Sequence, residues 1–167
     1  MDPAVRARVI TVSDRCAAGL AEDRSGPLAA ELLTAHGVEV DGVRVVPDEI
    51  AAITAQIRAG VVDGCDVILT TGGTGLAPRD VTPEAVAPLL DRVIPGLAEA
   101  LRADPRQRVP TSVLSRGVAG IVGRSLVVTL PGSTGGVRDG VALIGPLLEH
   151  IVAQLAGGDH ARPPGGG

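Results

Sequence analysis

Short apolar, β-branched runs recur along the chain and predict strands that are buried on both faces. They cover residues 9–12, 66–69 and 126–130. Continuous runs of this kind are typical of parallel sheets that helices cover on both sides. An alternating segment at residues 38–46 predicts a further strand, and Asp41-Gly42 within it favours a β-bulge.

Segments with apolar residues at helical spacing alternate with these strands. The expected helices cover residues 25–36, from 50 to near 60–64, from 83 onward, 97–102, about 138–144 and 146–155. Thr82 is expected to cap the third of them, with Pro83 at its first position, and Pro88 should shorten or kink it. Such alternation predicts a mostly parallel sheet with helices on both faces.

Residues 1–156 are expected to form one domain, since the 167-residue length suits a single core. Residues 157–167 are rich in Gly and Pro and are expected to be a disordered tail. Residues 111–121 are consistent with either a strand or an irregular extended segment, and their pairing stays open.

The composition excludes several classes of function. All 15 basic residues are arginine, which excludes Walker-type phosphate loops because these require a lysine. The chain has no Phe, Tyr or Trp, so a flat ring of a ligand cannot be stacked on an aromatic side chain. The formal net charge is −4 and no dense basic tract occurs, so no nucleic-acid partner is expected.

The chain lacks an apolar run of membrane-spanning length, and its first ten residues lack a signal-peptide pattern. We therefore expect a cytoplasmic protein with no membrane partner. Cys16 and Cys65 form no metal-ligand pattern and are expected to be inert small hydrophobic residues. The three histidines are scattered, so no zinc site is expected.

A glycine-rich stretch directly follows the predicted strand at residues 66–69. It reads Thr71-Gly72-Gly73-Thr74-Gly75, with Asp80 five residues further on. Glycines allow a sharp turn and a close approach of the backbone to a ligand, and the free N–H groups of such a loop suit phosphate or carboxylate oxygens. The alternative is an ordinary turn, since many such loops bind nothing.

Polar residues follow each of the other predicted strands as well. Ser13-Asp14 follows the first, Asp48 follows the second, and Pro131-Gly132-Ser133 follows the last. The carboxyl ends of parallel strands meet at one edge of a sheet, where such proteins bind ligands. Asp48 and Asp80 could share Mg2+, which would suit phosphoryl or nucleotidyl transfer. Alternatively, Asp48 is a helix N-cap and Asp80 a turn residue.

The motifs resemble those of a known family. T-T-G-G-T-G-L-A-P-R-D-V-T-P-E-A, with S-R-G-V-A-G and L-P-G-S further on, is similar to the MogA/MoaB family and the gephyrin G domain. V-S-D-R-C and A-E-D-R-S-G near the start also resemble that family. The resemblance extends over residues 8–155, and the central motif is the specific part.

The resemblance implies a three-layer α/β/α sandwich that forms a homotrimer and acts as a molybdopterin adenylyltransferase. Such enzymes use Mg-ATP to adenylylate the terminal phosphate of molybdopterin, with release of pyrophosphate, and the product passes to a molybdenum-insertion enzyme. The catalytic and metal-binding acids would be Asp48 and Asp80. Substrate contacts would fall on Ser13, Asp14, Thr71, Gly72, Gly73, Thr74, Gly75, Ser115, Arg116, Pro131, Gly132 and Ser133, and Glu99 would line the site.

Two alternatives stay open. The Thr134-Gly135-Gly136 ending of the last motif resembles the MoaB branch, which implies a molybdopterin-binding or assembly protein without catalysis. The competence-damage family, which acts on pyridine nucleotides, is similar in fold and in its glycine motif. The T-P-E and P-G-S segments argue against that second family.

Overall fold

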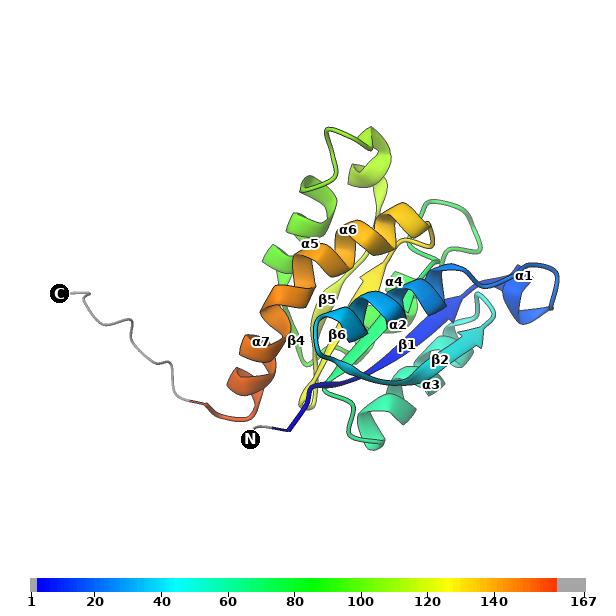
Figure 1. The fold of residues 1–167 in the computed structure, drawn as a ribbon. Coiled ribbons are helices and arrows are strands. Elements are labelled where there is room, and N and C mark those ends of the chain that lie inside the picture. The colour runs from blue at the N-terminus through cyan, green and yellow to red at the C-terminus, as the bar shows by residue number, and fades with distance from the viewer. Residues whose placement is uncertain (1–2, 159–167) are drawn as a thin grey trace.

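The structure, a computed structural model, describes residues 3–158. Six strands form one sheet at its centre (Figure 1). They are β1 (Arg6–Val12), β2 (Glu39–Val46), β3 (Val67–Thr71), β4 (Arg92–Val93), β5 (Ala119–Val122) and β6 (Ser125–Leu130). Their order in the sheet is β2-β1-β3-β6-β5-β4. The first four strands in this order pair in parallel, whereas β5 is antiparallel to both β6 and β4, so the expected mostly parallel sheet is confirmed.

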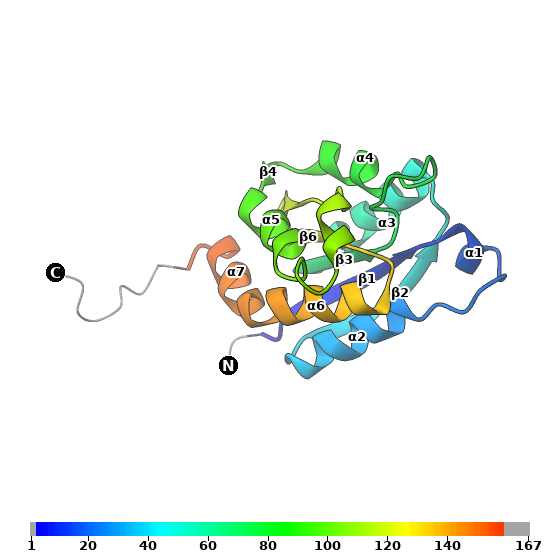
Figure 2. The same cartoon turned by 90° about the horizontal axis from the view of Figure 1, so that it is seen from above.

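Helices cover both faces of the sheet, as the view from above shows (Figure 2). α3 (Ile50–Val62) and α4 (Thr82–Val86) pack on one face. The other face carries α2 (Ser25–Ala35), α5 (Pro95–Ala103), α6 (Thr134–Ile144) and α7 (Leu148–Leu155). Short elements complete the fold: α1 (Asp14–Ala17) and the 3-10 helices η1 (Ala87–Leu89), η2 (Pro110–Leu114) and η3 (Gly145–Leu147). Within residues 3–158, no helix combines the length and the apolarity that crossing a bilayer requires.

The core consists of two aliphatic layers, one on each face of the sheet. Adjacent strand residues alternate between the layers, so that Leu69 faces α2 and α6 while Ile68 faces α3 and α4. Both side chains are fully buried. Burial of each such side chain contributes about 2 kcal/mol, and this is how a chain without aromatic residues stabilises its fold.

The strands extend further than the apolar runs predicted. β1 begins at Arg6, three residues earlier than expected. Arg6 and Ala7 pair with β2 on one side, and on the other side they pair with β3 and with Asp66, which precedes it. The expected bulge in β2 is confirmed: the register shifts from Ala7 opposite Val40 to Val9 opposite Val43. The undecided segment 111–121 contains most of η2 and most of β5, and the two-residue strand β4 was not predicted.

Thr82 is not the N-cap of its helix, as the sequence had suggested. It is the first residue of α4, Val81 precedes it, and neither contributes a side-chain cap. Thr82 is fully buried and its Oγ1 donates a hydrogen bond to the carbonyl oxygen of Gly72 at 2.9 Å. The hydroxyl therefore stabilises the glycine loop rather than the helix. Pro88 does end α4 early, and the last two helices begin at Thr134 and Leu148 rather than at the expected positions.

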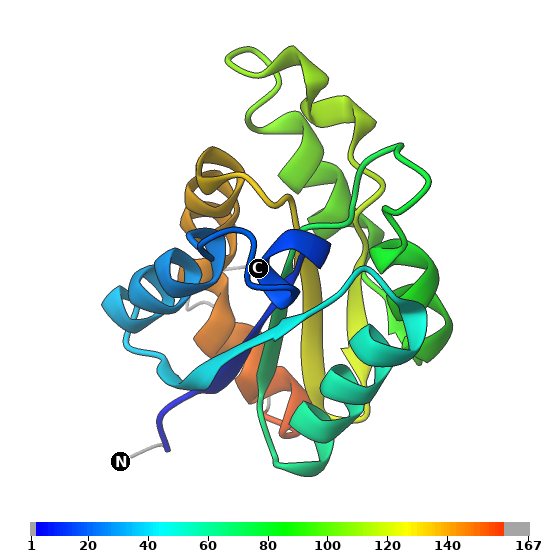
Figure 3. The same cartoon turned by 90° about the vertical axis from the view of Figure 1, so that its right-hand side faces the viewer.

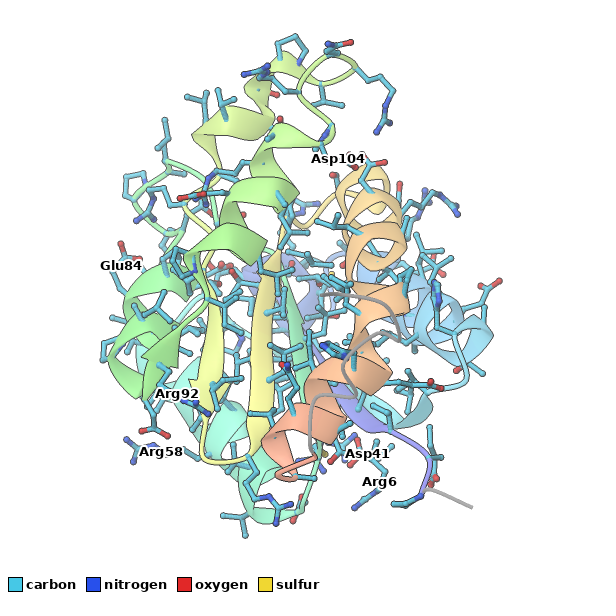
Figure 4. All side chains as sticks on the ribbon, turned by 90° about the vertical axis from the view of Figure 1, so that its left-hand side faces the viewer. Arg6, Asp41, Arg58, Glu84, Arg92 and Asp104 are labelled. Atoms are coloured by element: carbon cyan, nitrogen blue, oxygen red, sulfur yellow. The ribbon has the colours of Figure 1, made fainter. Side chains whose placement is uncertain are left out.

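A buried arginine ties β1 to β2 at the end of the sheet remote from the glycine loop. Arg8 is 4% exposed. Its Nε and Nη2 donate to Asp41 at 3.1 and 2.6 Å, and Nη2 also contacts Asp63 at 2.8 Å. The hydrogen bonds from Arg8 lower the pKa of the Asp41 carboxyl below its ordinary value, despite the opposing effect of burial. Figure 4 shows Asp41 near the lower end of the sheet, far from Glu84.

We expect the Asp41→Asn variant to lose about 3 kcal/mol of unfolding free energy at neutral pH, because part of the charge of buried Arg8 is left unbalanced. The pKa of Asp41 is lower in the folded than in the unfolded chain, so its contribution is complete above the unfolded pKa of about 4 and is lost as the pH falls further. Urea unfolding of both proteins at pH 7, 5 and 3 measures this. If the difference in unfolding free energy between the unmodified protein and Asp41→Asn were the same at pH 7 and pH 3, this prediction would be wrong.

Candidate functional site

Loops that follow the carboxyl ends of the parallel strands gather at one end of the molecule. Figure 3 shows α1 in front of the strands, with the loop after β3 and the segment between α5 and β5 above it. The loops after β1, β2, β3 and β6 carry the residues that the sequence had singled out, among them Asp14, Asp48 and Ser133. The edge predicted to hold a site therefore does bring these segments together.

The glycine loop after β3 turns back tightly against β1. Gly72 and Gly73 have φ values of +93° and +71°, which a residue with a side chain rarely adopts. A Cβ on Gly72 would overlap the carbonyl oxygen of Val12. The backbone N–H groups of Gly73, Thr74 and Gly75 have no acceptor among the described residues. Successive free N–H groups of this kind form a concave site for an anion.

Asp14 and Asp48 hold each other in place across the ends of β1 and β2. Asp48 Oδ2 accepts from the Asp14 N–H at 2.9 Å, and Asp14 Oδ1 accepts from the Asp48 N–H at 3.0 Å. Arg79 reaches back from the loop after β3 and donates two hydrogen bonds of 2.9 Å to the Asp14 carboxylate. The hydrogen bond from Arg79 is the main cause of the lowered pKa of Asp14. Asp48 is not the helix N-cap, which is Glu49.

The carboxylates of Asp48 and Asp80 both lie against the glycine loop. A Cβ on Gly73 would be 3.2 Å from Asp48 Oδ1, and one on Gly75 would be 2.8 Å from Asp80 Oδ2. Burial raises the pKa of Asp48, and the negative charges of Asp14 and Asp80 raise it further. Asp80 also serves the turn, because its Oδ2 accepts from the Ala77 N–H at 3.0 Å.

This donor set fits a magnesium ion. Asp48 Oδ1 and Asp80 Oδ1 accept no hydrogen bond from any described residue. Mg2+ prefers one or two carboxylates, with substrate phosphates and water as its remaining ligands. Among residues 3–158, no group of three or more His, Cys, Asp or Glu side chains could hold a metal ion. Within the described residues, the structure thus supplies two carboxylates beside the loop with the free N–H groups rather than a closed metal cage.

A cavity of about 730 Å³ opens beside the glycine loop. Its volume is in the range typical of small-molecule sites. Apolar side chains from α5, η2 and the loops form much of its wall: Leu76, Ala98, Leu101, Pro105, Val109 and Leu114. Gly72 to Gly75 and Asp80 form one polar side, and Pro131 to Ser133 with the first turn of α6 form another. Ser133 caps α6 by accepting from the Gly136 N–H at 3.0 Å, and the positive end of this helix adds to the attraction for an anion.

The structure separates the predicted site residues into three groups. Those that line the cavity are Gly72, Gly73, Thr74, Gly75, Asp80, Ser115, Pro131, Gly132 and Ser133. Ser13, Asp14 and Asp48 do not line the cavity, although Asp48 lies against the glycine loop and is hydrogen-bonded to Asp14. Thr71, Arg116 and Glu99 also do not line it. Thr71 is buried with its hydroxyl 2.8 Å from that of Ser25, and Glu99 is an exposed residue of α5.

The wall of the cavity between α5 and β5 was not predicted from the sequence. Pro105 and Val109, between α5 and η2, line the cavity, as do Leu101 and Arg102 of α5. Asp139 of α6 also lines it and pairs with Arg108 at 3.1 Å. The apolar residues Val109, Val113 and Leu114 around Pro110 were the available signal for this wall.

Comparison with known proteins shows which family the chain resembles. Residues 8–150 match the family described as a probable molybdopterin binding domain. A molybdenum cofactor biosynthesis protein B from Staphylococcus carnosus is 42% identical over 160 residues, which cover 93% of each chain. Bifunctional molybdenum cofactor biosynthesis proteins from Synechococcus elongatus and Chlorobaculum tepidum are 47% and 37% identical over 96% and 93% of this chain. The chain spans about half the length of each of these two relatives.

Solved structures support the same assignment. A molybdopterin biosynthesis protein from Mycobacterium abscessus has a TM-score of 0.88 at 47% identity, with 93% of this chain and 98% of that chain covered. MoaB from Thermus thermophilus has a TM-score of 0.86 at 43% identity, with 92% and 97% covered. CinA from Thermoplasma acidophilum, at 22% identity and a TM-score of 0.64 over 89% and 98% of the two chains, shares the fold alone. The chain therefore belongs to the MogA/MoaB family of molybdopterin-binding domains.

Proposed function

We propose that this protein acts in molybdenum cofactor biosynthesis and transfers the adenylyl group of Mg-ATP to the terminal phosphate of molybdopterin, releasing pyrophosphate. One observation carries the proposal: two carboxylates and a row of free backbone N–H groups meet at one loop beside a cavity of about 730 Å³. The names of the relatives, which refer to molybdopterin and to molybdenum cofactor biosynthesis, support the choice of substrate.

The cavity would hold the pterin. Its aliphatic wall, which includes Leu101 and Leu114, would contact the ring in place of the aromatic side chains that the chain lacks. The free N–H groups of Gly73, Thr74 and Gly75 would bind phosphate oxygens. The terminal phosphate would thus lie beside Asp80, which lines the same cavity.

The reaction needs positioning more than proton transfer. An oxygen of the terminal phosphate forms a bond to the α-phosphorus of ATP as the bond to the α–β bridging oxygen breaks, and pyrophosphate leaves with that electron pair. The attacking oxygen is already an anion, so no general base is required. Asp48 and Asp80 would hold Mg2+, which neutralises charge on the phosphates and orients them. Asp14 and Arg79 keep Asp48 in place through the hydrogen bonds already described.

We expect the purified protein to release one pyrophosphate for each molybdopterin when it is mixed with Mg-ATP and molybdopterin under anaerobic conditions. A coupled pyrophosphate assay measures this, and the same mixture without molybdopterin is the control. Retention of molybdopterin with no pyrophosphate would instead establish the non-catalytic binding role of the MoaB branch. Failure to retain molybdopterin at all would refute both.

The assembly and the cellular context belong to the same proposal. We expect a homotrimer that acts in the cytoplasm and passes its adenylylated product to a molybdenum-insertion enzyme. Light scattering of the purified chain tests the oligomeric state directly.

A further inference from the structure

Arg116 lies between two residues that line the cavity, yet its own side chain does not line it. Ser115 and Gly117 on either side contribute to the cavity wall. The Arg116 guanidinium extends instead to the carbonyl oxygens of Gly75 and Asp80 and to the carboxylate of Glu84.

The guanidinium of Arg116 bridges the first and the last residue of the segment from Gly75 to Asp80. Its Nε donates to the carbonyl oxygen of Gly75 at 2.9 Å, and its Nη2 donates to the carbonyl oxygen of Asp80 at 2.7 Å. Its backbone N–H donates to the carbonyl oxygen of Thr74 at 2.9 Å. Three contacts from one residue thus fix the backbone on both sides of this six-residue turn.

Glu84 completes this arrangement. Its carboxylate accepts from Nη1 of Arg116 and, at 3.5 Å, from Nη2. Glu84 lies in the first turn of α4, directly after the loop, and Figure 4 shows it on the outer surface of the molecule. The five donors of an arginine are spread over a planar fork that can reach a carboxylate and two carbonyl oxygens together, whereas the three donors of a lysine all lie on one nitrogen. An arginine that is already paired in this way is a poor candidate for binding a phosphate.

We propose that Arg116 is a positioning residue: it holds the turn from Gly75 to Asp80 in the conformation that places the Asp80 carboxylate at the cavity, and it does not bind the anionic substrate itself. This departs from the substrate contact that the family resemblance implied for Arg116. The proposal concerns the site to which we assign adenylyl transfer, and only its activity measurement rests on that proposed function.

Arg116→Lys tests this, because lysine keeps the positive charge and loses the fork. We expect kcat for pyrophosphate release to fall at least about 10-fold, as is usual when a group that orients a metal or catalytic ligand is lost. The Kd for molybdopterin, measured by equilibrium dialysis, should change less than about twofold. Hydrogen exchange of the amides between residues 75 and 80 should become faster.

The Glu84→Gln variant distinguishes loop positioning from substrate binding by Arg116, because the two roles predict different changes in the Kd for molybdopterin. If Arg116 positions the loop, this variant should lower kcat in the same direction as Arg116→Lys and leave the Kd for molybdopterin unchanged. If Arg116 binds the substrate, its release from Glu84 should make molybdopterin bind more tightly. Tighter binding by Glu84→Gln, or weaker binding by Arg116→Lys with kcat intact, would overturn the proposal.

Arg58→Lys is the matched control, because Arg58 is an exposed residue of α3 that Figure 4 shows far from Glu84. It should leave both kcat and hydrogen exchange unchanged. If the unmodified protein releases no pyrophosphate, the adenylyl-transfer function fails, but the binding and exchange measurements still decide the role of Arg116. Unchanged exchange between residues 75 and 80 in Arg116→Lys would then refute the positioning role by itself.

Discussion

Replacement of Asp80 by Asn should abolish most pyrophosphate release and leave the fold intact. Asp80 lines the cavity, and its Oδ1 accepts no hydrogen bond from the described residues. Asparagine can still accept from the Ala77 N–H through its amide oxygen, which preserves the turn. The loss of a charged ligand to the cation should cost about 3 kcal/mol of transition-state stabilisation, or roughly 100-fold in kcat.

The coupled pyrophosphate assay measures this loss, and thermal unfolding of the same samples shows that the fold is kept. Asp91→Asn is the matched control: the Asp91 carboxylate also accepts one backbone N–H, that of Gly123, at 2.7 Å, but Asp91 does not line the cavity. The control should retain full activity. If Asp80→Asn turned over as fast as the unmodified protein, Asp80 would be a turn residue only, and the magnesium site would have to be rejected.

The fold could be predicted from sequence wherever the signal is local. The apolar runs within β3 and β6 predict buried strands, and Gly72-Gly73 directly after β3 identifies the loop. The convergence of Asp14, Asp48 and Ser133 followed from the single rule that parallel strands end at one edge. The strand β4 was not predicted, because two residues are too few to show the alternation of apolar and polar positions that marks a strand.

The site was harder to predict where its parts are distant in the chain. Arg116 finds its partners 32 to 41 residues earlier, and nothing in the motif around it specifies that its guanidinium turns toward Gly75 and Glu84. Thr82 was expected to cap a helix because hydroxyls commonly do so, but its hydroxyl serves Gly72 instead. In both cases a contact made in the folded state determined the role, and local propensity was overridden.

Gly72→Ala should be the most destabilising substitution in the glycine loop. A Cβ at this position would overlap the carbonyl oxygen of Val12, which is part of the β1 backbone and cannot rotate away as a side chain could. The φ of +93° adds strain for any residue other than glycine. Overlap and strain together should reduce the unfolding free energy by about 4 kcal/mol, which lowers Tm by about 10 °C for a chain of this size.

Thermal and urea unfolding of Gly72→Ala measure this effect, and Gly96→Ala is the matched control. Gly96 lies in α5 and a Cβ there would have no atom within 4 Å, so alanine should be neutral or stabilise the protein by up to about 1 kcal/mol. A Gly72→Ala variant as stable as the unmodified protein would show that the loop can move away from β1 at no cost. The N–H groups of Gly73, Thr74 and Gly75 would then not be held in place before a ligand arrives, and the anion site would lose the rigidity on which its affinity depends.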